Sequence, residues 1–461
     1  MHLLHYSGSG FFRQRVLLAT LTARPIQISK IREDSSDSPG LKPYEASLLR
    51  LLCAITFGSR VHIDATGTVL TYTPGQLAGA DPENPISLKH ACHPGRGISY
   101  YLETLLLLAP FCKNPLSITL TGVTDGTELD CSVDVTRSVT VPTLHKILAL
   151  AAGGSRQQEG QGGADGEQGV GSGASVASSV SFQVKILRRG FPPKGGGEVH
   201  VHCSGVLNKA PQPFTLLDVG RVKRIRGIAF AENVSPILAR RCITKIRQIF
   251  NDFLPDVWVY MDTPTRRKQG QTQDTGTGEQ QTDKPRRGVG VTLVAETIKG
   301  NFKGASASVV KTGDSDDSLS HKQKAADASR ATGNSKLRLL LEEEAKMAPE
   351  ERKASAGDEF EMIGELAARR LLLEIQQGGV VDTSHQYMAL LFAAAADEYQ
   401  PSKLRLSQLT PYTIQFIRHL RDFLGVTFHF EHEVRGDDND SPEVDLKCVG
   451  AGLRNTARKT F

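Results

Sequence analysis

The stretch RRGFPPKGGGEVHVHC, residues 188–203, places two prolines and three consecutive glycines between two runs that the sequence predicts to be strands. Clustered glycine and proline predict the turn of a hairpin. Successive glycines also let backbone N–H groups approach an anion, and the basic side chains add positive charge. A strain-relieving turn and a loop that grips phosphate or RNA are therefore both open. The candidate contacts are Arg188, Arg189, Lys194, Gly195, Gly196 and Gly197.

The whole chain has 461 residues, enough for one large core and a second small one. Its 55 Lys and Arg against 50 Asp and Glu give a net charge of +5, which permits nucleic-acid binding without demonstrating it. Seven scattered cysteines without a C-x-x-C pair predict a reducing compartment and neither a metal site nor a disulfide framework. We also expect no cofactor.

Membrane insertion and secretion are not predicted. Arg13 and Arg15 interrupt the N-terminal apolar run before it reaches the length of a signal peptide. The most apolar helix candidate, ISYYLETLLLLAPF, contains Glu103 and is too short to cross a bilayer.

Three segments have the composition of flexible insertions: 153–180, 263–287 and 311–357. The first is rich in Gly, Ser and Gln, and it contains too little apolar surface to offset the entropy of ordering. We predict that all three are loops inserted into folded structure.

A pattern recurs around these segments: an amphipathic helix followed by two strands joined at a turn. PYEASLLRLLCAITFG precedes SRVHIDATGTVLTYTPG, SVTVPTLHKILALAA precedes the quoted hairpin, and TPYTIQFIRHLRDFLG precedes VTFHFEHEVRGDDNDSPEVDLKCVG. The repetition predicts an α/β (α+β) fold in which three helix-plus-sheet units form one large domain.

A stretch of different character begins at residue 217. It is predicted as strand, helix, strand, strand, strand, with Ser235 as the helix N-cap and Pro236 as the first helical residue. The predicted organisation is therefore a large domain at 1–216, a small α/β domain at 217–310, a disordered insertion at 311–357, and the third repeat at 358–461.

The glycine turn also resembles the signature of the RNA 3′-terminal phosphate cyclase family. In that pattern a basic residue and Gly are followed, at fixed spacing, by Pro, three glycines and a β-branched residue, as in RRGFPPKGGGEV. Further segments are similar to the family's cyclase-like branch, namely NPLSITLTGVTD, KPYEASLLRLL, VKRIRGIAF, GVTLVAET, GGVVDTSHQYMALL and LTPYTIQFIRHL. The resemblance implies three similar βαβ-type repeats and a small inserted domain.

The resemblance also indicates that cyclase chemistry is lost. True cyclases form a covalent adenylate on a histidine at the start of the last helix, and the matching position here is Tyr412. A phenol is a poor substitute for a neutral imidazole nucleophile. At the N-terminus, Tyr6 stands near the position of an acidic residue, and Phe11 and Phe12 replace smaller neighbours.

What the resemblance implies instead is a non-catalytic assembly factor of the small-subunit processome in the nucleolus, required for pre-rRNA processing. Its implied partners are a ribosome-biogenesis GTPase, pre-rRNA and small nucleolar ribonucleoprotein. The residues leave two alternatives open. A site-specific endoribonuclease would use Arg418, His419 and Arg421, which a solvated helix face also explains. A retained cyclase is the weaker alternative.

The densest basic stretch in predicted ordered structure is GRVKRIRG. It would attract RNA with salt-sensitive affinity, although an acidic protein partner or a solvated face fits as well. Its candidate RNA contacts are Arg221, Lys223, Arg224 and Arg226.

Overall fold

The computed structural model describes residues 3–79, 88–127, 129–153, 180–193, 195–232, 234–262, 287–311, 359–431 and 443–455. Apart from their terminal residues, the three predicted insertions lie outside these ranges. Among the described residues, no helix has the length and apolarity needed to span a membrane. In the same ranges, no three His, Cys, Asp or Glu side chains are grouped as metal ligands.

The first repeat folds as strand, helix, strand, helix and hairpin, with the sheet order β1-β2-β5-β4. The first two strands are parallel, and the hairpin adds to them in antiparallel pairing. The predicted turn contains Gly67, with a φ of 71°. The elements are β1 (Leu4–Ser7), α1 (Phe12–Thr22), β2 (Ile26–Ser29), α2 (Pro43–Ile55), β4 (Arg60–Ile63) and β5 (Leu70–Thr73), with β3 (Thr56–Phe57) and β6 (Gln76–Leu77) pairing separately.

The other two repeats have the same strand order, β7-β8-β10-β9 and β11-β16-β18-β17. The second contains β7 (Leu88–Ala91), α3 (Ile98–Leu108), β8 (Leu116–Gly122), α4 (Val133–Val135), a π-helical turn η2 (Thr136–Thr140), α5 (Val141–Ala151), β9 (Phe182–Arg188) and β10 (Gly197–Cys203). The third contains β11 (Thr215–Leu216), α11 (Gln386–Ala395), β16 (Pro401–Leu406), α12 (Pro411–Leu424), β17 (Phe428–Glu431) and β18 (Val444–Val449). The predicted threefold repetition is confirmed.

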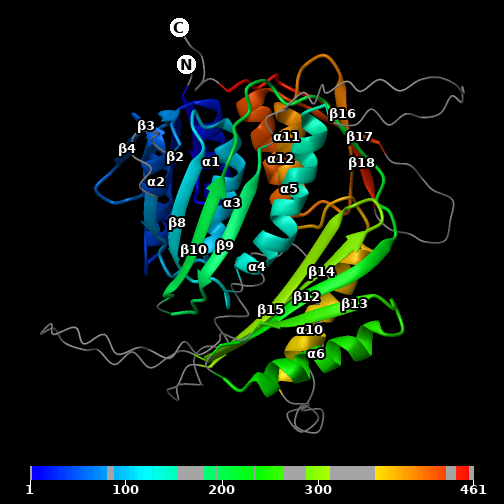
Figure 1. The fold of residues 1–461 in the computed structure, drawn as a ribbon. Helices are drawn as coiled ribbons and strands as arrows, with labels where there is room; N and C mark the ends of the chain where they lie inside the picture. Colours follow the sequence, from blue (N-terminus) through cyan, green and yellow to red (C-terminus); the bar gives the residue numbers. More distant parts are fainter. Residues whose placement is uncertain are drawn as a thin grey trace, which may run out of the picture.

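The helices of the three repeats pack against one another in a shared core. α1 contacts α12, α2 and α3, and α11 contacts α12 and α5. Strand burial alternates, as in β10, so that one face of each sheet packs inward. The apolar runs in α3 and α11 are explained by burial along their whole length. Packing at this junction places α1 and α12, from opposite ends of the chain, side by side (Figure 1).

A second core forms around the inserted sheet, whose order is β13-β12-β14-β15. Ser235 caps the first helix of this unit by accepting a hydrogen bond from the backbone N of Ile237, and Pro236 follows it, as predicted. Figure 1 shows the unit beneath the three-repeat domain. Its elements are β12 (Val222–Glu232), α6 (Pro236–Phe250), β13 (Val257–Asp262), β14 (Arg287–Thr297), β15 (Phe302–Lys311) and α10 (Glu359–Gln376).

The insertion ends later than we predicted, and the strand that precedes it belongs to the third repeat rather than to the second. We predicted that the third repeat begins at residue 358, but α10 packs on the inserted sheet through Ile363, Ala367 and Leu371. β11 pairs in parallel with β16, so the insertion interrupts the third repeat after its first strand. An amphipathic helix shows in its sequence which face is apolar, but not which sheet covers that face.

The signature stretch folds as the predicted hairpin of β9 and β10, and its turn lies against the end of β8. A Cβ on Gly190 would lie 2.6 Å from the backbone O of Gly122 and closer still to the backbone N of Gly197. Gly190 also exchanges hydrogen bonds with Thr124, whose N donates to Gly190 O at 2.8 Å. Gly196, by contrast, faces open space. Backbone packing therefore requires a glycine at position 190 but not at position 196.

We expect Gly190→Ala to lower the free energy of unfolding by about 2–4 kcal/mol, because the added methyl overlaps backbone atoms that cannot move aside. Gly196→Ala is the control, and only its left-handed φ of 82° opposes a side chain there, at a cost of about 1–2 kcal/mol. Urea denaturation of both variants measures the difference. Equal losses would contradict a packing role for Gly190.

Candidate functional site

Tyr412, which we predicted to match the cyclase histidine, lies in the first turn of α12. Thr410 caps this helix with its side chain. From α1, Arg13 Nη2 donates a hydrogen bond to the Tyr412 hydroxyl at 3.2 Å, and Gln14 Nε2 donates to the Tyr412 backbone O at 2.9 Å. The starts of the first and last described helices therefore meet at this tyrosine.

The ring of Phe11 covers this meeting point. Its centroid lies 6.1 Å from that of Tyr412 and 6.4 Å from that of His419. Phe11 has a φ of 57°, in the left-handed region that costs a non-glycine residue about 1–2 kcal/mol. A bulky ring thus lies beside Tyr412 at a backbone position suited to glycine.

A buried ion pair lies behind Tyr412. Arg13 Nη1 is 2.9 Å from Glu103 Oε2, and the Tyr387 hydroxyl donates to the same oxygen at 2.7 Å. Burial acts to lower the pKa of Arg13, but the Glu103 carboxylate and nearby tyrosines outweigh it and raise that pKa. The guanidinium therefore stays charged and is neutralised inside the protein rather than presented to a phosphate.

His419 is fully buried, whereas the sequence suggested a histidine on a solvated face. Its Nδ1 lies 2.9 Å from Gln14 Oε1, and its Nε2 lies 3.5 Å from Arg15 Nε. Burial, followed by the positive charge of Arg15, lowers the pKa of His419 to about 4. The imidazole is therefore neutral at physiological pH and packs edge-on against Tyr6.

The predicted cluster of Arg418, His419 and Arg421 does not form one exposed site. Both arginines are exposed on α12, while the histidine between them faces the core. A general acid and its phosphate-binding cations must reach the same substrate atom. These three side chains lack that arrangement.

Arg189 in the signature loop forms ion pairs with carboxylates of three other segments. Its Nη1 lies 2.5 Å from Asp134 and 3.4 Å from Asp125, and its Nη2 lies 2.9 Å from Asp262. The guanidinium also lies 4.1 Å from the ring centroid of Phe230. With its side chain only 8% exposed, Arg189 joins the hairpin to the segment after β8, to α4 and to the inserted sheet. Our prediction of an anion contact is corrected here, because carboxylates already neutralise this charge.

The other predicted contacts of the loop differ in exposure. Arg188 and Gly196 are exposed, whereas Gly195 and Gly197 are buried. Lys194 lies outside the described residues. The glycines therefore do not form one continuous open cradle, and RNA contact at the exposed positions stays a prediction.

The predicted basic stretch lies at the start of β12 and is partly neutralised. Arg224 is 2.6 Å from Glu296. Arg226 makes a bidentate pair with Asp256, at 2.8 Å and 3.0 Å. Arg221 and Lys223 are exposed. The stretch thus presents less free charge than its sequence suggests, although it remains on the surface.

Sequence reasoning missed a buried polar chain between the two units. His385 Nε2 lies 2.6 Å from Thr140 Oγ1, its Nδ1 is hydrogen-bonded to Asp382, and Gly304 N donates to that carboxylate at 3.3 Å. The order of hydroxyl, imidazole and carboxylate is that of a catalytic triad, but Thr140 is 1% exposed and inaccessible to a substrate. Polar residues in the otherwise apolar GGVVDTSHQYMALL were the available signal.

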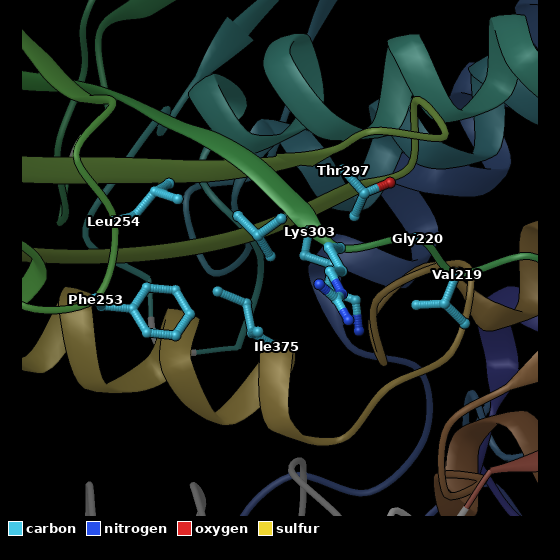
Figure 2. Close-up of a pocket in the computed structure, with 9 residues that line it drawn as sticks. Val219, Gly220, Phe253, Leu254, Thr297, Lys303 and Ile375 are labelled. Carbon is cyan, nitrogen blue, oxygen red and sulfur yellow. The ribbon is translucent and has the colours of Figure 1, made fainter.

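A pocket of about 310 Å³ lies where the chain enters and leaves the inserted unit, away from Tyr412 (Figure 2). Phe253 and Ile375 supply apolar walls. The Lys303 ammonium donates to the backbone oxygens of Glu374, at 2.7 Å, and Gly378. Burial lowers the pKa of Lys303. Lys303 is thus engaged by the backbone, whereas Arg221, which also lines the pocket, is exposed.

The geometry defines a class of α+β protein with three βαβαββ repeats, an inserted four-stranded sheet and a tyrosine at the start of the last described helix. The family model for RNA 3′-terminal phosphate cyclase matches residues 4–161 and 174–430. The chain belongs to the RNA 3′-terminal phosphate cyclase family.

Similar proteins come from distant eukaryotes. An RNA 3′-terminal phosphate cyclase-like protein of Bos taurus is 37% identical over 99% of this chain and 98% of its own length. A probable cyclase-like protein of Dictyostelium discoideum is 35% identical over the full length of both chains. The rRNA processing protein rcl1 of Schizosaccharomyces pombe is 32% identical, over 99% of this chain and 98% of its own.

We expect Arg189→Ala to lower the free energy of unfolding by about 3–5 kcal/mol, because it leaves the buried carboxylates of Asp125 and Asp134 without their shared cation. The neighbouring Arg188 is exposed, so Arg188→Ala is the control and should change stability by about 0.5 kcal/mol or less. Chemical denaturation measures both. If both variants lost a similarly small amount of stability, Arg189 would not be needed to neutralise the buried carboxylates.

Asp125 should make stability depend on pH. Burial, then the charge of Asp134, raises the pKa of Asp125 to about 7 despite the opposing Arg189. The folded state therefore holds this proton more tightly than the unfolded state, whose pKa is about 3.9, and stability falls as pH rises between those values. Asp125→Asn removes the titration. The variant's stability relative to the parent should rise from pH 5 to pH 8 by at most about 1.4 kcal/mol per unit, and a pH-independent difference would contradict this.

Proposed function

We propose that the chain is a non-catalytic assembly factor of the small-subunit processome. It is required for pre-rRNA processing and small ribosomal subunit biogenesis, and it works in the nucleolus. The observation that carries the proposal is Tyr412 at the cyclase histidine position, hydrogen-bonded to Arg13 and flanked by Phe11. Forming a histidine adenylate requires an accessible neutral imidazole that can attack a nucleotide phosphate.

The nearby His419 does not supply that imidazole. It is neutral at physiological pH, but it is enclosed by Gln14, Arg15 and Tyr6. A nucleotide would have to displace these neighbours before its phosphate came within bonding distance. A scaffold whose former reactive centre is filled by its own side chains is suited to binding rather than to turnover.

The names of two relatives support a role in rRNA processing. The Schizosaccharomyces pombe relative is called an rRNA processing protein, and the Bos taurus relative is called cyclase-like rather than a cyclase. These proteins align with almost the whole of this chain. We infer from them a role in rRNA processing for this chain as well.

The proposed partners are a ribosome-biogenesis GTPase, pre-rRNA and small nucleolar ribonucleoprotein. Long-lived association needs a rigid surface, and the shared helical core with its buried ion pairs supports rigidity. Exposed cations such as Lys223 and Arg418 would attract the phosphates of RNA. An endoribonuclease is the alternative, but its candidate residues on α12 do not converge.

Two measurements test the proposal together. Purified protein incubated with radiolabelled ATP should acquire no covalent label, because the position of the nucleophile is a tyrosine. In cells whose sole copy is Tyr412→Phe, pre-rRNA processing should stay within about twofold of normal, since the variant loses only a hydroxyl that accepts from Arg13. Northern analysis of pre-rRNA and affinity purification with RNA sequencing supply the readouts.

Three outcomes would overturn the proposal. A protein adenylate that disappears in Tyr412→Phe would restore the cyclase. Cleavage of a pre-rRNA fragment by purified protein, lost in Arg418→Gln or His419→Gln variants that remain folded, would favour a nuclease. Failure of the tagged chain to co-purify with any pre-ribosomal particle would exclude an assembly role.

A further inference from the structure

β13 is an edge strand of the inserted sheet (Figure 1). It carries two aromatic side chains that are exposed to solvent. Val259 is buried in the core formed with α6, whereas the flanking Trp258 and Tyr260 are 51% and 58% exposed. Their ring centroids lie 6.0 Å apart with the planes at 63°. Trp258 is the single tryptophan of the chain. About half of its surface is therefore left in water at a sheet edge.

The large domain covers only another part of the same sheet face. In the ladder, Tyr260 pairs with Ile228, which in turn pairs with Thr292, so the three side chains share one face. Thr292 is buried, and its hydroxyl lies 3.2 Å from Ser132 Oγ in the large domain. The large domain therefore covers this face of the sheet at β14, while Trp258 and Tyr260 on β13 remain exposed to solvent.

Cations surround the aromatic pair. Arg226 is the ladder partner of Trp258, and the Arg247 guanidinium lies 5.9 Å from a Trp258 ring centroid. Lys223 and Arg224 act electrostatically on Asp256, which lies just before the strand. Against these four cations stand the carboxylates of Asp256 and Glu296, so the group has a net charge of +2.

We propose that this edge binds single-stranded RNA, with one or two unpaired bases stacked on Trp258 and Tyr260. Exposed aromatic rings beside flexible cations are the usual means of holding unstacked bases, since rings contact base faces and cations contact phosphates. Arg247 and Lys223 are placed for the phosphates. Asp256 interrupts the positive charge near Arg226, which limits the site to a short segment.

Single-stranded RNA fits these features better than the other candidates. Bases in a duplex are already stacked on one another and cannot lie on the rings. An acidic peptide would use the cations but would leave the aromatic faces without stacking partners. The inference goes beyond the proposed assembly role, because purified protein can bind an oligonucleotide without any pre-ribosomal particle.

Because Trp258 is the single tryptophan of the chain, the protein's tryptophan fluorescence reports on RNA binding at this edge alone. Titration with unlabelled oligouridylate of about 12 nucleotides should quench the fluorescence of Trp258, with the same Kd as that found by anisotropy of a fluorescein-labelled copy. Trp258→Ala should weaken binding by at least about fivefold, and Trp258→Phe should recover part of the loss because it restores a ring. Tyr399→Ala is the matched control, since Tyr399 is 80% exposed elsewhere, and it should change Kd by less than about twofold.

The salt dependence tests the cations separately. Arg247→Gln should reduce the slope of log affinity against log salt by about 0.7, the value for one phosphate contact on a single strand. Arg60→Gln, at an exposed position of β4 in the large domain, should leave the slope unchanged. Thermal unfolding of each variant shows that it is folded before binding is compared.

The proposal is overturned by saturating RNA that leaves Trp258 fluorescence unchanged, or by a folded Trp258→Ala variant with unaltered affinity. Equal competition by duplex RNA would also exclude base stacking. If the variant instead loses a protein partner while RNA binding persists, the edge is a protein-docking strand. Absence of the chain from pre-ribosomal particles would contradict the proposed function alone.

Discussion

The guanidinium of Arg189 contacts carboxylates from three separate parts of the chain: Asp125 after β8, Asp134 in α4 and Asp262 in the inserted sheet. Two of these carboxylates are almost completely buried, so they depend on a cation that reaches them from the hairpin. The hairpin brings Arg189 there because Gly190 lets its backbone approach β8 closely. Through Asp262 and the ring of Phe230, the same guanidinium also contacts the inserted unit.

Charge is also neutralised internally around Tyr412. Arg13 is held by Glu103, and Tyr387 donates to that carboxylate, so the charge at the start of α1 is satisfied within the core. Tyr412 and Phe11 occupy the remaining space at the start of α12. The helices bury their apolar faces in the shared core, and the polar groups around Tyr412 contact one another.

Local features were predicted well. The hairpin at the glycine run and the cap of α6 by Ser235 follow from backbone preferences that act over a few residues. The burial of His419 was not predicted, because its exposed neighbours Arg418 and Arg421 dominate the local composition. The placement of α10 was also missed, since an apolar helix face fits more than one sheet.

The sequence by itself determined the fold class, the three repeats and the inserted sheet, because periodicity and turn chemistry are properties of neighbouring residues. It indicated the family through motifs that resemble those of the family. Only the tertiary structure decided which charges are free and which side chains surround Tyr412. Its hydrogen bond from Arg13 spans 399 positions of the chain. Burial and pairing between residues so far apart depend on packing, which local sequence patterns do not encode.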